Sequence, residues 1–368
     1  MLPRLTATYH VRCDAAAIEE RARAIAVEQS VEMPLGAIAD PFVLSEIVGR
    51  VEDIRDQGDG VFAVRVALSG ETIGHDAGQL INMLFGNSSL HDDVVLNDVE
   101  VPPALAAAFG GPRHGLDQLR QRAGAGGRAL TCSALKPQGL PPAALAELAR
   151  RFALGGIDYI KDDHGLADQA YASLAARVAA VTAALRELDR PTTHYVPSLS
   201  GDLAAMRAQI AIAREAGIDT IMVAPMVAGL ANFHALVKEN PGLAFIAHPS
   251  LAGAARLAPP LLLGKLFRLL GADAVVFPHY GGRFGYSPAT CRLLARAALD
   301  GWQGLRPCLP VPAGGMSRQR VAEMLDFYGA DIMLLIGGAL LQARERLVEE
   351  TAAFVAEVHG HGYGHRPG

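Results

Sequence analysis

The feature that most constrains the fold is a repeated alternation of short β-rich runs and helical patterns, which begins near Ala129. Eight such runs follow one another: ALTCSALKP, IDYIKDD, THYVPSLS, DTIMVAPM, LAFIAHPS, AVVFPHY, LRPCLPVPAGG and DIMLLIGG. Most of the segments between them carry amphipathic patterns, such as PAALAELARRFALGG. Strands that alternate with helices at this spacing predict βα units and a parallel sheet. Eight units predict a closed (β/α)8 barrel.

A doubly wound open sheet is the alternative arrangement for such units. It is less favoured, because no GxGxxG sequence opens a helix after the first run.

The part of the chain before Arg128 has a different rhythm. Two alternating runs, TATYHVRC and VFAVRVALSG, predict half-buried antiparallel strands. The segment AAAIEERARAIAVEQS has an amphipathic helical pattern, and INMLFGNSSL predicts a strand that ends in a turn. A Gly- and Ala-rich segment, AGAGGR at 123–128, is favoured as a linker. We therefore predict an N-terminal α+β (ferredoxin-like) domain over residues 1–125 and a barrel domain over 126–368.

Composition excludes several classes of protein. The 368 residues carry a formal net charge of −5, which argues against a nucleic-acid partner. No run of about 18 apolar residues predicts a membrane span, and the start MLPRLTATYH lacks the pattern of a signal peptide. The four cysteines are widely spaced and form neither a disulfide framework nor a CxxC metal motif. We expect a cytoplasmic protein.

The sharpest chemical motif is IKDDHG at 160–165, which follows directly on an apolar run. In a barrel, the carboxyl ends of the strands carry the active site. Alternate side chains of a strand share a face, so Lys161 and Asp163 are expected to point together, while Asp162 and His164 point the other way unless the strand end turns His164 inward. A lysine beside acids suits proton abstraction or metal ligation. A salt-bridged strand end without chemistry is the alternative.

Two glycine pairs end the seventh and eighth runs, Gly314–Gly315 and Gly337–Gly338. Barrels commonly bind phosphate in these two loops, where glycine lets the backbone approach the anion. Tight turns are the alternative for each pair. The histidines His248 and His279 also stand at strand ends, either as site residues or as caps of loop carbonyls.

Several motifs together resemble the RuBisCO large-chain superfamily: GGIDYIKDDHGLADQ, SALKPQGL, LINMLFGN and FGGPRHG. The resemblance covers nearly the whole chain. It implies that Lys161 is carbamylated and binds Mg²⁺ together with Asp163 and His164. His164 stands where the family has a glutamate, and imidazole suits this hard cation less well than a carboxylate does. The resemblance also implies that Lys136 assists enolisation, although Gln138 replaces the second lysine of its motif.

The same resemblance implies an assembly. In this superfamily the N-terminal domain of one subunit completes the barrel site of another, so a homodimer with shared sites is expected. Asn87 matches the asparagine that reaches the partner's site, and Glu28 falls at the segment of the catalytic glutamate. The two glycine pairs match the phosphate-binding glycines of the family.

Departures from the family pattern narrow the expected activity. The loop HYGGRFGYS after the sixth run lacks the lysine that carboxylases use, and Arg283 supplies a cation in a different context. His248 is followed by Pro249, where the family has an arginine for a second phosphate. We therefore expect carboxylation to be lost and enolisation to remain, with His248 as a catalytic candidate and His279 and Arg283 as substrate-binding candidates.

The resulting hypothesis is an isomerase that enolises a phosphorylated ketose by 1,3-proton transfer. The short chain and the K-D-D-H variation are most similar to the RuBisCO-like proteins that isomerise 5-methylthioribulose 1-phosphate in methionine salvage. One alternative is a decarboxylase or hydrolase of a 3-oxo sugar-acid phosphate, in which Arg283 would pair with the substrate carboxylate. Another is a barrel that only binds a metabolite. The terminal HGHGYGH is expected to be a disordered end rather than a metal site.

Overall fold

The computed structural model describes residues 3–188 and 192–362, and the chain folds into two compact units. The first comprises the chain up to Gly111 together with Leu251–Leu262 and Gly301–Leu305. The second comprises Pro112–Ser250, Leu263–Asp300 and the chain from Arg306 onward. The last part of the histidine-containing terminus, residues 363–368, lies outside the described residues.

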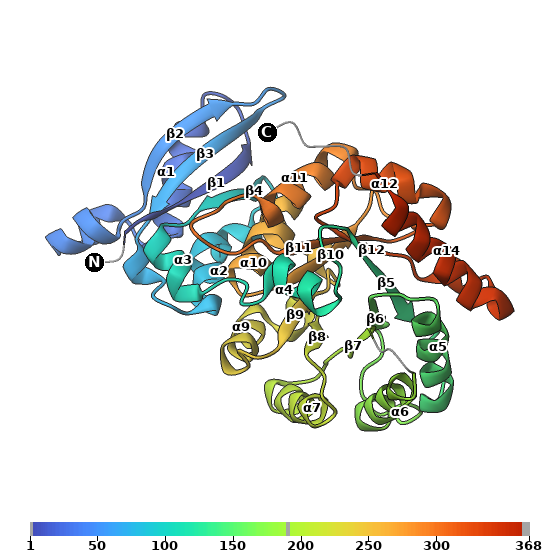
Figure 1. Ribbon diagram of the computed structural model, residues 1–368. Helices are drawn as coiled ribbons and strands as arrows, with labels where there is room; N and C mark the ends of the chain where they lie inside the picture. Colours follow the sequence, from blue (N-terminus) through green and yellow to red (C-terminus); the bar gives the residue numbers. More distant parts are fainter. Residues whose placement is uncertain (1–2, 189–191, 363–368) are drawn as a thin grey trace. The chain divides into compact units, whose positions relative to one another are not determined.

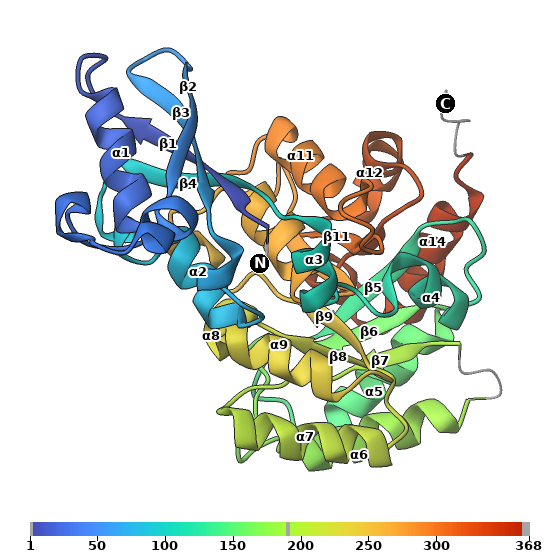
Figure 2. The same cartoon turned by 90° about the vertical axis from the view of Figure 1, so that its left-hand side faces the viewer.

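The first unit is a four-stranded antiparallel sheet with helices (Figures 1 and 2). Its elements are β1 (Leu5–Arg12), α1 (Ile18–Glu28), β2 (Arg50–Asp56), β3 (Val61–Leu68), α2 (Ala77–Phe85), β4 (Val94–Glu100) and α3 (Pro103–Phe109). The strand order is β2-β3-β1-β4. This βαββαβ arrangement is the ferredoxin-like topology, so the predicted α+β class is confirmed.

Strict alternation of buried and partly exposed residues explains β1, whose burial alternates along almost its whole length. The run INMLFGNSSL, in contrast, is not a strand. Its first half belongs to helix α2, which begins after Asp76, where the Asp76 carboxylate accepts a hydrogen bond from the Gln79 backbone N–H at 2.8 Å. Leu80 and Leu84, four residues apart, are both fully buried on one face of the helix. The prediction of a strand here was wrong because the helical cap and spacing were missed.

The second unit contains eight parallel strands, each within one of the eight predicted runs. They are β5 (Leu130–Leu135), β6 (Tyr159–Asp162), β7 (His194–Val196), β8 (Thr220–Val223), β9 (Ala244–Ala247), β10 (Ala274–Pro278), β11 (Leu309–Ala313) and β12 (Met333–Leu335). The intervening helices are α5 (Pro142–Leu154), α6 (Leu174–Arg186), α7 (Leu203–Glu215), α8 (Pro225–Ala228), α9 (Leu230–Glu239), η6 (Pro260–Leu266), α10 (Phe267–Leu269), α11 (Pro288–Leu299) and α12 (Val321–Tyr328), and α13 (Gly338–Leu341) and α14 (Leu347–Gly360) follow β12.

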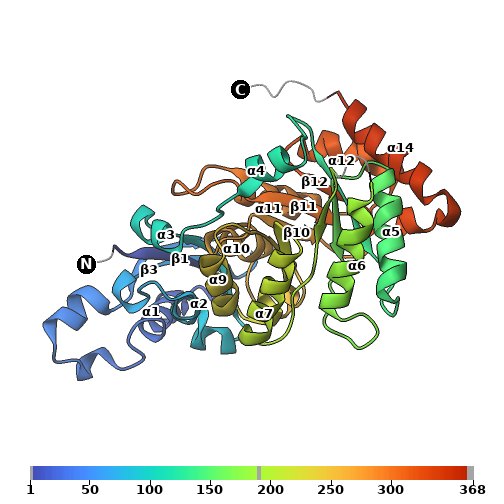
Figure 3. The same ribbon diagram turned by 60° about the horizontal axis from the view of Figure 1, so that its bottom comes forward.

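Two four-stranded arcs make up the barrel wall, with strand orders β12-β5-β6-β7 and β11-β10-β9-β8. Backbone hydrogen bonds join the arcs on one side, where the Met222 N–H donates to the Pro197 carbonyl at 2.9 Å and the Leu199 N–H donates to the Met222 carbonyl at 2.9 Å. On the other side β11 and β12 are neighbours. Helices cover the outside of the strands, and α5 and α6 lie side by side in Figures 1 and 3. The predicted (β/α)8 barrel is confirmed, and the open sheet is excluded.

One buried cluster fills the barrel interior, and it receives alternate apolar residues of the strands, such as Leu130 and Cys132 of β5 and Tyr159 of β6. Ala123 and Ala125 also belong to this cluster and are 5% and 4% exposed. The segment expected to be a linker is therefore packed against the core of the second unit. Among the described residues, no helix is both long and apolar enough to span a membrane.

Candidate active site

Three titratable side chains meet where β5 and β6 end. Lys136 follows β5, and its Nζ donates to the Asp163 carboxylate at 2.6 Å. Asp163 follows β6, and the same carboxylate oxygen lies 3.1 Å from Nδ1 of His164. The Asp163 side chain is only 8% exposed, whereas His164 is 50% exposed. Asp163 therefore holds both neighbours from a largely buried position.

The charge state of Asp163 follows from these contacts. Burial alone would raise its pKa, but the hydrogen bonds from His164 and Lys136 outweigh burial and lower the pKa below its ordinary value. Asp163 is thus an anion throughout the neutral range and fixes the Lys136 amine by a charge-assisted hydrogen bond.

Lys161 lies on β6 with the same alternation as Asp163. Its residue is 4% exposed, and its Nζ donates to the Asp162 carbonyl at 2.8 Å. Burial lowers its pKa, and the nearby charge of Asp163 counteracts this only in part. A lowered pKa raises the fraction of neutral amine, which is the form that can accept a proton or react with CO2.

A histidine stack closes one side of the cluster. The rings of His164 and His248 are parallel within 8° with centroids 4.6 Å apart. Burial, together with the charge of Lys161, lowers the pKa of His248 to about 2, so this imidazole is neutral at physiological pH. Nδ1 of His248 lies 2.8 Å from the Ser250 hydroxyl, which fixes the ring orientation. The alternation of the strands thus brings Lys136, Lys161, Asp163 and His248 to one end of the barrel.

Comparison with known proteins shows the family to which this chain belongs. The profile described as "Ribulose bisphosphate carboxylase large chain, catalytic domain" matches residues 115–286. A protein of Rhodospirillum rubrum named 5-methylthioribulose-1-phosphate isomerase is 63% identical over 98% of this chain and 97% of its own. The chain belongs to the RuBisCO large-chain family.

Further relatives agree with this assignment. The crystal structure of a Rubisco-like protein from Rhodopseudomonas palustris shares 54% identity and a TM-score of 0.91, with both chains covered fully. A 2,3-diketo-5-methylthiopentyl-1-phosphate enolase of Geobacillus kaustophilus is 32% identical over 75% of this chain and 70% of its own. The chain is therefore similar over its length to RuBisCO-like proteins.

The metal that this RuBisCO family implies can be tested against the donor atoms present. Within residues 3–188 and 192–362, no three His, Cys, Asp or Glu side chains come together as a metal-binding group. Asp163 and His164 alone supply one carboxylate and one imidazole. A carbamate on Lys161 would add a further oxygen ligand from the same strand end, and a divalent ion fits the residues in that form.

The glycine pairs have different surroundings. A Cβ on Gly315 would lie 3.0 Å from the Arg283 backbone nitrogen, and a Cβ on Gly282 would lie 2.0 Å from the Gly314 carbonyl oxygen. The Arg283 N–H also donates to that carbonyl at 3.0 Å. Gly314 and Gly315 therefore let the loop after β10 pack closely on the loop after β11.

The second glycine pair lies beside the charged cluster, which consists of Lys136, Lys161 and Asp163. A Cβ on Gly337 would be 4.0 Å from Cε of Lys136, and Gly338 begins α13 with open space at its Cβ position. Of the two pairs, Gly337–Gly338 is thus the one that lies next to Lys136.

His279 does not join the cluster. Ala274 and Val276 of β10 face the barrel interior, so His279 falls on the opposite, outer face. Its Nδ1 lies 2.9 Å from the hydroxyl of Tyr328 in α12, and the residue is fully buried. His279 thus lies apart from the charged cluster, and its expected contact with substrate stays a prediction. Arg283 is exposed, has no acidic partner among the described residues, and lies 5.4 Å from the Phe284 ring centre.

In the first unit, the other two expected site residues contact each other. The Asn87 amide donates to the Glu28 carboxylate at 2.8 Å. Gln29 supports this arrangement, because its amide nitrogen donates to the Met83 carbonyl and its amide oxygen accepts from the Ser88 N–H. The sequence motifs indicated both residues but gave no sign that they touch.

Sequence reasoning missed a buried network behind the cluster, centred on Asp162 and Arg177. Its signal was present in the sequence, because Arg177 interrupts an otherwise apolar helical pattern, LAARVAAV, and Asp162 has the outward position of its strand.

Proposed function

We propose that this protein is a 5-methylthioribulose-1-phosphate isomerase that acts by 1,3-proton transfer. The observation that carries the proposal is the near full-length identity of 63% to the Rhodospirillum rubrum protein of that name. The cluster of Lys136, Lys161 and Asp163 supports it, because the reaction requires a base and a proton donor beside an anchored sugar phosphate.

The proposed chemistry is redox-neutral: one proton moves between neighbouring carbons, and one hydroxyl proton moves between the oxygens that they carry. A base takes a proton from a carbon next to the ketone, the electron pair forms an enediolate, and a proton is returned to the other carbon. Lys136 is the group we assign to proton transfer at carbon, oriented by its 2.6 Å hydrogen bond to Asp163. The neutral His248 imidazole is available to hydrogen-bond a substrate hydroxyl and so to orient it.

Mg²⁺ is the proposed cofactor, held by Asp163, His164 and a carbamate on Lys161. When bound, it would stabilise negative charge on the enediolate oxygens. The low exposure and lowered pKa of Lys161 support carbamylation, since only the neutral amine reacts with CO2.

For the substrate phosphate we propose Gly337 and Gly338, with the exposed Arg283 as a counter-charge. The proximity of Gly337 to Lys136 supports this assignment. Gly314 and Gly315 pack on the loop that contains Arg283, so only the backbone that faces away from this loop could contact the phosphate. The loop at 279–287 contains no lysine, so we expect no carboxylation of ribulose bisphosphate.

A homodimer with shared sites is the proposed active form, in which Asn87 and Glu28 act on the partner's barrel. The hydrogen bond between these two residues supports a joint role, because one segment of the first unit presents both side chains.

The proposal is tested by NMR of the purified protein in D2O with Mg²⁺, bicarbonate and candidate substrates. We expect deuterium incorporation and a new ketose phosphate from 5-methylthioribulose 1-phosphate. Turnover of 2,3-diketo-5-methylthiopentyl 1-phosphate instead would assign the enolase reaction, and release of CO2 from a 3-oxo sugar-acid phosphate would assign the decarboxylase. Exchange with none of these compounds would refute an enolising function.

A further inference from the structure

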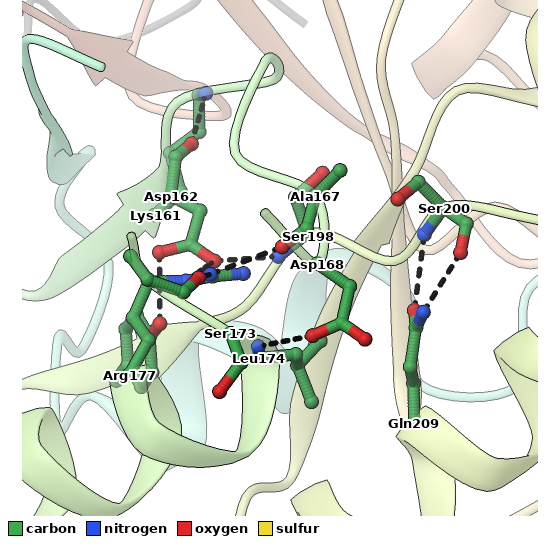
Figure 4. A network of polar contacts seen from close by, with 12 residues as sticks. Lys161, Asp162, Ala167, Asp168, Ser173, Leu174, Arg177, Ser198, Ser200 and Gln209 are labelled. Carbon is green, nitrogen blue, oxygen red and sulfur yellow. Dashed lines mark hydrogen bonds and ion pairs between the residues drawn. The ribbon is translucent and has the colours of Figure 1, made fainter. Parts of the chain in front are cut away.

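An ion pair that is completely removed from solvent lies directly behind the charged cluster. Nε of Arg177 donates to the Asp162 carboxylate at 2.9 Å, and both side chains are 0% exposed. Asp162 stands between Lys161 and Asp163 in the sequence but on the opposite face of β6. Figure 4 shows Arg177 reaching Asp162 from helix α6.

Arg177 also holds the loop that leads away from Asp163. Its Nη1 donates to the carbonyl of Ala167 at 3.0 Å and to that of Ala172 at 2.6 Å. The end of the same loop is fixed by Asp168, whose carboxylate accepts from the Leu174 N–H at 2.7 Å (Figure 4). The β6–α6 loop, which begins with His164, is therefore tied to one guanidinium.

Asp162 connects the other side of the network to the next strand. It accepts from the Tyr195 hydroxyl at 2.8 Å and from the Ser198 N–H at 3.0 Å. Gln209 extends the connection by bonding both the N–H and the carbonyl of Ser200 (Figure 4). The ends of β6 and β7 and the start of α6 thus share one buried polar centre.

Stability alone is a weak reason for such a pair. Desolvating two charges costs about as much as their attraction returns, and apolar residues of similar volume often replace a buried ion pair without loss. A guanidinium group, in contrast, fixes the relative positions of the groups that accept its hydrogen bonds, because its donors are rigidly arranged. Arg177 hydrogen-bonds backbone carbonyls of the β6–α6 loop, and Asp162 accepts from the backbone N–H of Ser198 after β7. The pair therefore fixes the backbone on either side of the residues that carry the proposed chemistry.

We propose that Arg177 and Asp162 are positioning residues that hold Asp163 and His164, and through Asp163 the Lys136 amine, in the geometry needed for proton transfer. The inference rests on the proposed function. Neither residue touches the substrate in this account, and both act through the strand end and the β6–α6 loop.

The principal test is Arg177→Lys, with Arg177→Met as a harsher variant. Lysine keeps a positive charge opposite Asp162 and so favours folding, but a single ammonium cannot reproduce the fork toward Asp162 and the two loop carbonyls. We expect kcat to fall about 10- to 100-fold, since small misplacements of reacting groups cost that much. KM should change less than about threefold, because ground-state binding is retained.

Arg268 provides a matched control, since it is also an arginine at 0% exposure in the second unit. It donates to the carbonyls of Ala297, Asp300 and Arg306, which lie near the end of α11 and before β11, away from the charged cluster. Arg268→Lys should lower the unfolding midpoint in the same way but leave kcat unchanged. Equal losses of kcat in Arg177→Lys and Arg268→Lys, or a full kcat in Arg177→Lys, would overturn the positioning role.

Crystal structures of the two variants give a readout that does not require activity. The inference predicts that Arg177→Lys breaks the Lys136–Asp163 contact and the His164–His248 stack, whereas Arg268→Lys preserves both. Retention of both contacts in Arg177→Lys would refute the inference even if the wild-type protein enolised no ketose phosphate. Inactivity of the wild-type protein, by contrast, would refute the proposed function and leave this structural test decisive.

Discussion

At the scale of single residues, His194 shows how one contact determines the pKa of a side chain. It begins β7 at the end of the barrel opposite the charged cluster, and its Nδ1 lies 3.1 Å from the Asp219 carboxylate. Burial would lower the pKa of His194, but the hydrogen bond and charge of Asp219 outweigh it and raise the pKa above 6.5. The pKa of Asp219 is lowered by the same pair, against the opposing effect of its burial.

The sign of the pH dependence follows. A histidine whose pKa is raised in the folded state stabilises the fold at acidic pH, and this contribution is lost as pH rises through the folded pKa. We expect Asp219→Asn to cost more unfolding free energy at pH 5.5 than at pH 8.5, as measured by urea denaturation. NMR titration should give His194 a pKa above 6.5 in the wild type and a lower one in the variant. Equal costs at both pH values would contradict this account.

His279 marks where residue-level prediction from the sequence ends. Alternation along a strand predicted correctly that Lys161 and Asp163 share a face, because each strand register follows from its apolar residues. In AVVFPHY almost every residue is apolar and buried, so the sequence did not show which alternate residues face the barrel interior. The inward register of Ala274 and Val276, together with the contact between His279 and Tyr328, decides which way the imidazole faces.

At the scale of elements, the loops after β10 and β11 depend on glycine for close packing. A Cβ on Gly282 would lie 2.0 Å from the Gly314 carbonyl oxygen, which is backbone and cannot yield easily. We expect Gly282→Ala to cost about 1–3 kcal/mol of unfolding free energy and to raise KM by displacing Arg283. Gly285→Ala is the matched control in the same loop, since nothing lies within 4 Å of its Cβ position. Indistinguishable KM values and unfolding midpoints would show that this packing does not matter.

The strands that are buried on both faces were predicted well from the sequence. All eight barrel strands lie within the expected apolar runs, because central parallel strands must be apolar throughout. Strands β2 and β4, in contrast, lie at the edges of the first sheet, and their charged sequences RVEDIRD and VVLNDVE gave little strand pattern. Helix α2 was mistaken for a strand because the run INMLFGNSSL is short and apolar, and the Asp76 cap and Leu80, which indicate a helix, lie outside it.

At the scale of the whole molecule, the proposed homodimer can be tested by combining two inactive subunits. If Asn87 acts on the partner's barrel, a hybrid of one Asn87→Ala subunit and one Lys161→Ala subunit contains one intact site and one doubly altered site. Mixed and reassembled dimers should therefore recover about half of the wild-type turnover per hybrid. Tagged subunits purified in tandem would isolate the hybrid for assay, and a fully inactive hybrid would exclude shared sites.

The central claim is that Lys136, anchored by Asp163 at the end of the barrel, transfers the proton at carbon. The most direct measurement is the rate of solvent deuterium exchange into 5-methylthioribulose 1-phosphate by the wild type and by Lys136→Met, with circular dichroism to verify folding. We expect exchange to fall about 10²- to 10⁴-fold in the folded variant, because a positioned acid or base usually contributes that much to the rate. Exchange at the wild-type rate in Lys136→Met would contradict it.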